Sequence, residues 1–445
     1  MATPCLTTDL TTWIDRLARL LDRRISWRLL PILTGLLFAT GRRTVASWLR
    51  AGELGKDYQD YYYFLASLGR NVKSLALVVL QIALNVVGPQ GRVLLAIDDT
   101  PSKRYGPKVE GAGIHHNPTP GPAGAQFVYG HVWVTLAWVV RHPLWHAIGL
   151  PLLARLYVRQ KDIDGQCLPF LRQVTFQTKL VMAAELITWA AKGLKILGRA
   201  MWAVTDGAYA KRTFLRAAAA AQVVVVSRLR KDAALFAVPV APKQRGRGRP
   251  RKYGKKSISL AKRAGQRRGW QVETFVLYGE DKIRRYKTFL ATYKPAGGVI
   301  RVVLVKEDHG AWRAYFCTDV QATVREILEA VADRSALEQV FHDVKEVHGV
   351  GQAQTRNYWT NVAVYHLNLW LHTLIELWAW HRSAKELVDR RRSPWDDEDR
   401  RPSHADRRNA LRRQCLEEEF RAGAAAGPLP RKIESLWRRV VRLVA

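Results

Sequence analysis

The 445-residue sequence is short of cysteine and of acidic residues, and it contains no internal repeat. Its four cysteines lie far apart, with no Cys-x-x-Cys pair and no histidine at a zinc-ligand spacing. Neither a disulfide framework nor a cysteine-based zinc site is therefore predicted. The N-terminus lacks a basic segment followed by an apolar core, so we expect no signal peptide. These absences favour a protein of the reducing cytoplasm.

An uninterrupted membrane-spanning run is also missing. The longest apolar stretch, residues 357–380, is about long enough to cross a bilayer, but it contains His366, Asn368, His372 and Glu376. Polar side chains of this kind are costly in lipid, so the stretch predicts a buried core helix and no membrane partner.

The charge balance is strongly one-sided. Lys and Arg number 71 against 38 Asp and Glu, which gives a formal net charge of +33 at pH 7. This surplus exceeds what solubility requires and predicts a polyanionic partner. Nucleic acid is the first candidate for this partner, and an anionic membrane surface is the second.

A charged stripe marks one predicted helix, residues 334–345. At about 100° per residue, Arg334, Glu338, Phe341 and Lys345 fall within roughly 60° of one another on a single face. A structural helix usually places apolar residues in such a stripe, so two cations around a glutamate indicate an anion site, a metal site or both. An ordinary surface ion pair between Arg334 and Glu338 is the alternative.

Two apolar runs upstream end in aspartate. The first leads into Asp98 and Asp99, and the second leads into Asp206. Both runs predict buried strands, and the carboxyl ends of such strands are where sites cluster. Together with Glu338, three separately placed carboxylates suit a pair of Mg²⁺ ions, because hard cations take oxygen ligands and keep positions for water and phosphate.

The order Asp, Asp, Glu on strand, strand and helix resembles the ribonuclease H-like core of DDE transposases from bacterial insertion sequences. One branch of that family carries Tyr-x2-Arg-x3-Glu-x6-Lys around its third acid. Arg334, Glu338 and Lys345 match this spacing, while Val331 stands at the tyrosine position. The resemblance covers roughly residues 90–380.

The first two family motifs are matched more loosely. The first is often Asp-x-Thr, which selects Asp98 with Thr100, whereas a register one residue later would select Asp99. The second is often Asp-x-x-Tyr, which Asp206 and Tyr209 match.

The resemblance implies an α/β fold, a ribonuclease H-like mixed sheet flanked by helices, with a β-rich insertion and an N-terminal helical domain. It implies Asp98, Asp206 and Glu338 as catalytic ligands of two Mg²⁺ ions, for which Mn²⁺ would substitute. Arg334 and Lys345 would hold backbone phosphates near the scissile bond.

The activity implied is cut-and-paste transposition, in which the ends of the element are cleaved and joined to target DNA. We expect a homodimer on double-stranded DNA, located in the cytoplasm at the nucleoid, and the resemblance includes closure of the cut end as a hairpin. Two alternatives stay open. A ribonuclease H-like nuclease without strand transfer would share the acids, and a domesticated DNA-binding protein would share only the charge.

Four regions are predicted. They are a helical N-terminal DNA-binding domain (1–88), a catalytic core (89–229 and 312–380), a basic β-rich insertion (230–311), and a charged solvated linker with a C-terminal helix (381–445). In the first region, residues 40–50 resemble half of a helix-turn-helix, with a solvated helix face as the alternative.

Further residues complete the predicted DNA contacts. Residues 243–268 hold 12 Lys and Arg and no acid. Within this run, Arg247 and Arg249 suit a narrow A·T minor groove, unless the run is a generic disordered loop. Lys103 follows the first acid in a loop rich in Pro and Gly. Trp270 would either stack on a flipped base or pack in the core of the inserted strands.

Overall fold

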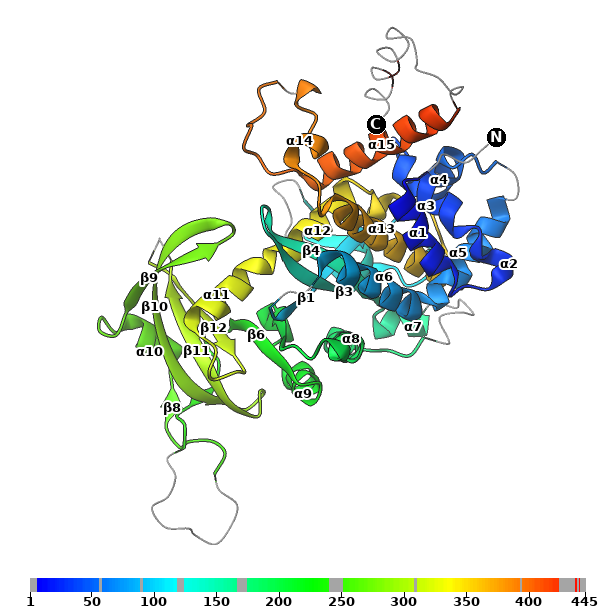
Figure 1. Ribbon diagram of the computed structural model, residues 1–445. Coiled ribbons are helices and arrows are strands. Elements are labelled where there is room, and N and C mark those ends of the chain that lie inside the picture. The colour runs from blue at the N-terminus through cyan, green and yellow to red at the C-terminus, as the bar shows by residue number, and fades with distance from the viewer. Residues whose placement is uncertain are drawn as a thin grey trace.

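A large mixed β-sheet flanked by helices runs through the computed structural model (Figure 1). The structure describes residues 6–55, 58–88, 91–117, 124–165, 174–239, 251–307, 310–392 and 394–423, together with Trp437 and Val440. The strands are β1 (Val93–Lys103), β2 (Gly113–His116), β3 (Phe127–His142), β4 (His146–Tyr157), β5 (Met201–Thr205), β6 (Val223–Leu229), β7 (Leu235–Phe236), β8 (Ser257–Ile258), β9 (Gln271–Leu277), β10 (Glu280–Tyr293), β11 (Gly298–Lys306) and β12 (Trp312–Cys317). Their order is β2-β3-β1-β5-β6-β12-β11-β10-β7-β8, with β4 paired to β3 and β9 paired to β10.

The first half of the sheet is the part that carries the acids. Strand β3 pairs antiparallel with both β1 and β4, whereas β5 and β6 continue the sheet parallel to β1. Helix α8 (Lys179–Leu194) connects β4 to β5, after α7 (Gln160–Gly165), and α9 (Arg212–Ala220) connects β5 to β6. The mixed sheet flanked by helices, which the resemblance implies, is confirmed.

The second half of the sheet, with α10 (Leu260–Gly265), forms the end of the molecule opposite the N-terminal helices (Figure 1). Its longest strand, β10, pairs with β9 through its first half and with β11 through its second. The sequence patterns did not predict β10. Its charged residues Glu280, Asp281, Lys282, Arg284 and Arg285 interrupt the apolar alternation that identifies a strand.

The N-terminal helices are α1 (Thr8–Ala18), α2 (Arg23–Ser26), α3 (Leu29–Phe38), α4 (Val45–Ala51), α5 (Tyr58–Arg70) and α6 (Val72–Val87). Thr44 caps α4, because its hydroxyl accepts the backbone N–H of Ser47 at 3.1 Å. Helices α3 and α4 approach closely at Gly35, where a Cβ would lie 2.0 Å from the carbonyl oxygen of Trp48. The turn before α4 also contacts the segment between α12 and α13, since the backbone N–H of Arg43 donates to Gln352 Oε1 at 2.7 Å.

The long apolar run forms α13 (Tyr358–Ala379), which is buried on all sides against α5, α6, β4 and α15 (His404–Gly423). Its polar side chains have partners inside the core. His366 Nε2 accepts the backbone N–H of Ala154 at 3.0 Å, and Trp370 Nε1 donates to the carbonyl of Leu152 at 2.8 Å. Among the described residues, no single helix is long and apolar enough to cross a membrane, although the bent pair α5 and α6 meets the same criteria by length and composition.

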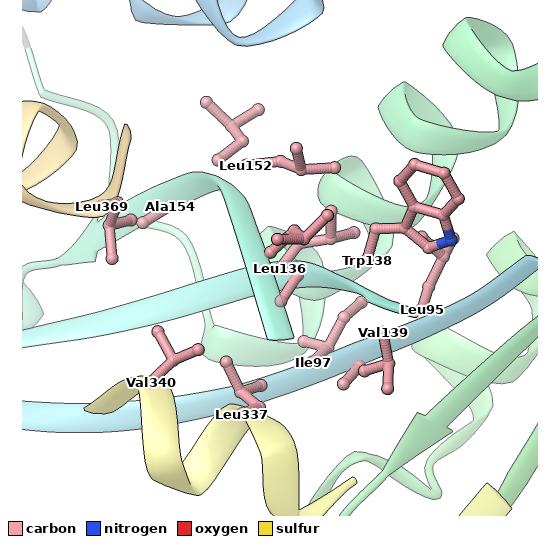
Figure 2. Packing of buried hydrophobic residues seen from close by; sticks show 14 of the residues in the cluster. Leu95, Ile97, Leu136, Trp138, Val139, Leu152, Ala154, Leu337, Val340 and Leu369 are labelled. Carbon is pink, nitrogen blue, oxygen red and sulfur yellow. The ribbon is translucent and has the colours of Figure 1, made fainter. Parts of the chain in front are cut away.

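Helices α11 (Val324–Asp333) and α12 (Ser335–Glu346) follow one another, with Arg334 at their junction. Figure 2 shows Leu337 and Val340 of α12 facing Ile97 of β1 and Val139 of β3. Full burial of such side chains contributes roughly 2 kcal/mol each, so this contact fixes the rotation of α12 on the sheet. The charged stripe is thereby held at the margin of the buried face.

The solvated linker predicted beyond residue 381 is wrong where α15 forms. The short helices α14 (Ala384–Leu387) and η5 (Arg390–Arg392) come first. Helix α15 then packs on α13 and α3 with three of its arginines buried, namely Arg407, Arg408 and Arg412. Arg407 pairs with the buried carboxylate of Glu376 at 2.6 Å, and Arg408 donates to the carbonyl of Leu37 at 2.5 Å. Composition alone could not reveal this, because an arginine becomes a core residue only when acceptors elsewhere in the chain satisfy it. The predicted C-terminal helix lies outside the described residues, apart from Trp437 and Val440.

Candidate active site

Two of the predicted acids lie side by side on neighbouring strands, although β1 does not end at the acids as predicted but continues to Lys103, which is therefore in a strand and not in a loop. Strands β1 and β5 pair in parallel with Ile97 opposite Thr205, so the residues that follow, Asp98 and Asp206, lie at the same edge. The carboxylate of Asp206 accepts the backbone N–H of Ala208 at 3.4 Å, which caps the short helix η3 (Gly207–Tyr209). The sheet therefore brings together two acids that are far apart in sequence.

Arg334 joins the third acid to this pair. Its Nη1 lies 2.6 Å from Asp98 Oδ2, and its Nη2 lies 2.5 Å from Glu338 Oε1. The Glu338 side chain is 57% exposed, whereas those of Asp98 and Arg334 are 20% and 23% exposed. The guanidinium thus neutralises two carboxylates that converge from β1 and α12 at the surface.

Asp98 is the member of this cluster whose ionisation the folded protein disfavours. Burial raises the pKa of its carboxyl from 3.8 to about 6. Arg334 and the backbone N–H of Asp99 counteract the shift, whereas the negative charges of Asp99 and Asp206 add to it. A buried acid beside other acids binds a further cation favourably, since the cation removes repulsion that the folded chain cannot relieve.

The adjacent acid, Asp99, has different partners. Its Oδ2 lies 2.6 Å from Lys179 Nζ on α8, and its Oδ1 accepts the hydroxyl of Tyr209 at 2.7 Å. Successive side chains of a strand point to opposite faces, so Asp98 and Thr100 face α12 while Asp99 faces α8. Tyr209, the tyrosine of the second motif, therefore holds Asp99 and not the acid of its own motif.

Lys345 lies near Asp98 on the α12 side. Its ammonium donates to the hydroxyl of Thr100 at 2.6 Å, two residues from Asp98 on the same face of β1. Burial lowers the pKa of Lys345. The helical stripe predicted from spacing thus delivers Arg334 and Lys345 to one face of β1, although α12 itself begins after Arg334.

Two cavities whose walls contain more cations than acids lie beside the site. One, of about 640 Å³, adjoins Asp206 and is lined by Lys211, Arg228, Arg230, Lys231 and Arg313 among others. The second, of about 680 Å³, adjoins Lys345 and includes Arg42 and the exposed Lys103. Phosphate groups on both sides of the acids would find positive charge.

Other predicted contacts are not brought to the acids. Trp270 lies in the insertion, partly buried, where its indole N–H donates to the carbonyl of Gln266 at 3.1 Å and Lys287 Nζ lies 4.8 Å from its ring centre. These contacts are those of a packed residue. Arg247 and Arg249 lie outside the described residues.

Sequence reasoning missed Lys179 altogether. It occupies the first turn of α8, and no pattern around it indicates a partner on β1, some 80 positions upstream. Its pairing with Asp99 depends on how α8 lies across the sheet. No local sequence signal could have found it.

Three carboxylates from two strands and a helix, at one edge of a mixed sheet, are a donor set for hard divalent cations. Consistent with this class of site, residues 16–287 match the family model for the DDE superfamily endonuclease. The match spans more than half of the chain, and the protein belongs to this superfamily of endonucleases. It includes Asp98 and Asp206 and ends before Glu338.

Among curated proteins, no match was found. Among solved structures, the chain is similar to a piggyBac transposase synaptic complex with hairpin DNA, at 8% identity and a TM-score of 0.38 over 93% of this chain and 74% of that one. It is also similar to the NurA nuclease from Sulfolobus solfataricus, at 10% identity and a TM-score of 0.24 over 62% and 86% of the two chains. Both TM-scores are low, and the family membership rests on the sequence match.

Proposed function

We propose that this endonuclease is a cut-and-paste DNA transposase of the insertion-sequence branch, which cleaves the ends of its element and joins them to target DNA. The observation that carries the proposal is that Arg334 bridges Asp98 and Glu338, while Asp206 follows the neighbouring parallel strand beside Asp98. If Arg334 and Glu338 formed only a structural ion pair, no further acids would be needed beside them. Asp98 is nevertheless held there, although burial raises the pKa of its carboxyl.

The residues present fit a pair of divalent cations. Asp98, Asp206 and Glu338 would hold two Mg²⁺ ions, or Mn²⁺ in their place, which when bound activate water or a 3′-hydroxyl and stabilise the leaving oxygen. Asp98 must lose its proton to act as a ligand, so cation binding weakens as the pH falls below about 6.

Arg334 has two successive tasks in this proposal. Without substrate it neutralises Asp98 and Glu338, at 2.6 and 2.5 Å. With the cations bound, Arg334 would pair with a backbone phosphate, and Lys345 would pair with a neighbouring one. Both contacts orient the strand for in-line attack.

The surrounding charge supports duplex DNA as the substrate. The cavities beside Asp206 and Lys345 place cations on both sides of the acids, with Lys103 exposed in the second. Arg247 and Arg249 would add minor-groove contacts. A homodimer is proposed because each subunit has one set of acids and an element has two ends to cut.

The test uses the purified full chain, Mg²⁺, a DNA fragment carrying the inverted repeats that flank the gene, and a supercoiled target plasmid. We expect cleaved ends and joined products, and neither with Glu338→Gln. Glu398→Gln is the control, because Glu398 is exposed in the segment before α15 and lines neither cavity beside the acids. Normal cleavage by Glu338→Gln would overturn the assignment of the site.

The same assay separates the two alternatives. Cleavage without joined products identifies a nuclease without strand transfer. A gel shift of the DNA fragment without cleaved or joined products identifies a DNA-binding protein.

A further inference from the structure

A second group of possible metal ligands lies on a cavity of about 890 Å³, whose wall also includes Glu338. Asp343 belongs to α12, His348 follows that helix, His372 lies on α13, and His404 begins α15. All four are buried, with exposed fractions of 6%, 1%, 2% and 4% respectively. Three elements thus deliver three imidazoles and one carboxylate to a single interior point.

The side chains are close enough to share one ion. One ligand atom each from Asp343, His372 and His404 lies within 4.8 Å of the others, and His372 Nε2 is 3.6 Å from Asp343 Oδ2. His348 Nε2 lies 2.8 Å from His404 Nε2. A metal bound between two imidazole nitrogens would replace this direct contact with two coordinate bonds.

The polar atoms around the group are incompletely satisfied within the described part of the chain. His348 Nδ1 and His372 Nδ1 are buried and have no hydrogen-bond partner there. Neutral buried imidazoles keep a lone pair for a metal.

One histidine is already oriented as a ligand. The Nδ1 of His404 donates to Glu376 Oε1 at 2.6 Å, and the other oxygen of Glu376 pairs with Arg407 at 2.6 Å. A carboxylate that holds one ring nitrogen leaves Nε2 free to coordinate, which is the usual arrangement behind a metal-bound histidine.

We propose that Asp343, His348, His372 and His404 bind one Zn²⁺ ion, and that Glu376 positions His404 for it. Three imidazoles and a carboxylate supply the four ligands of a tetrahedral zinc site, and the rings of His372 and His404, which are stacked with their centres 4.0 Å apart, would turn to face the ion. The ion would tie the catalytic helix α12 to α13 and α15 in the interior, and this role does not depend on the proposed transposase activity.

The experiment is metal analysis of the full chain, purified without chelator, loaded with Zn²⁺ and dialysed against excess Mg²⁺. We expect about one zinc per chain, and His372→Gln should lose it. His381→Gln is the matched control, because His381 is exposed just beyond the same helix and should leave zinc content unchanged. Removing zinc from the wild-type protein should lower its Tm by about 5 °C, a readout that does not depend on whether His372→Gln folds.

The proposal is overturned if the wild-type chain retains no zinc and its Tm does not respond to Zn²⁺. It is also overturned if zinc is lost from Asp98→Asn and kept by His372→Gln, because the ion would then sit at the catalytic acids. Loss of cleavage with zinc still bound would count against the proposed function alone.

Discussion

Asp98→Asn should stabilise the metal-free protein while it abolishes cleavage. Burial of Asp98 raises the pKa of its carboxyl from 3.8 to about 6, so the folded state opposes ionisation of this side chain. A shift of about two units corresponds to roughly 3 kcal/mol at neutral pH, which is the upper limit of the gain from a neutral amide. The amide oxygen can still accept from Arg334.

The gain should depend on pH. An acid whose pKa is raised by folding contributes stability below its unfolded pKa of 3.8, and the contribution is lost as the pH rises through about 6. The Tm of Asp98→Asn should therefore match that of the wild type near pH 4 and exceed it by a few degrees at pH 7. Thermal unfolding in chelator at several pH values measures the difference.

The adjacent residue is the control. Asp99→Asn removes the ion pair with Lys179 and weakens the hydrogen bond from Tyr209, so it should destabilise the protein by about 1 kcal/mol. Two neighbouring substitutions thus have opposite signs. If Asp98→Asn lowers the Tm at pH 7, or if it cleaves DNA while Asp99→Asn does not, the assignment of the first acid is refuted.

Three further perturbations test other parts of the molecule. Tyr209→Phe removes the 2.7 Å hydrogen bond to Asp99 and should cost about 1 kcal/mol in urea unfolding, whereas an unchanged midpoint would show that the contact is unimportant. Trp270→Ala should lower the Tm by uncovering Lys287 but leave nicking intact; a normal Tm with incomplete double-strand cleavage would instead favour base stacking. Replacing the 12 cations of residues 243–268 with Gln should flatten the slope of log affinity against log salt by about 4 to 5 units, and an unchanged slope would mean that the run does not touch DNA. Substitution is preferable to deletion there, because Leu260 is buried.

Helix α12 shows which features helical periodicity can predict. Spacing alone predicted that Arg334, Glu338 and Lys345 share a face, because that face depends only on the helical repeat. The apolar runs before Asp98 and Asp206 likewise predicted strands, since buried strands need continuous apolar residues. These are local properties that neighbouring residues decide.

The choice between Asp98 and Asp99 required the tertiary structure. The sequence determined that two consecutive acids follow an apolar strand segment, and consecutive residues of a strand point to opposite faces. It could not say which face α12 covers. That depends on packing between Leu337, Val340 and the sheet, which joins segments more than 200 residues apart.

The same limit applies to the interior. Long-range contacts decide whether Arg407 is solvated or paired with Glu376, and whether His372 and His404 meet. The amino-acid sequence by itself determined the net charge, the helical stripe and the apolar strands. Only the tertiary structure decided which polar groups become neighbours, because burial and partner distance are set by packing between segments that no local pattern connects.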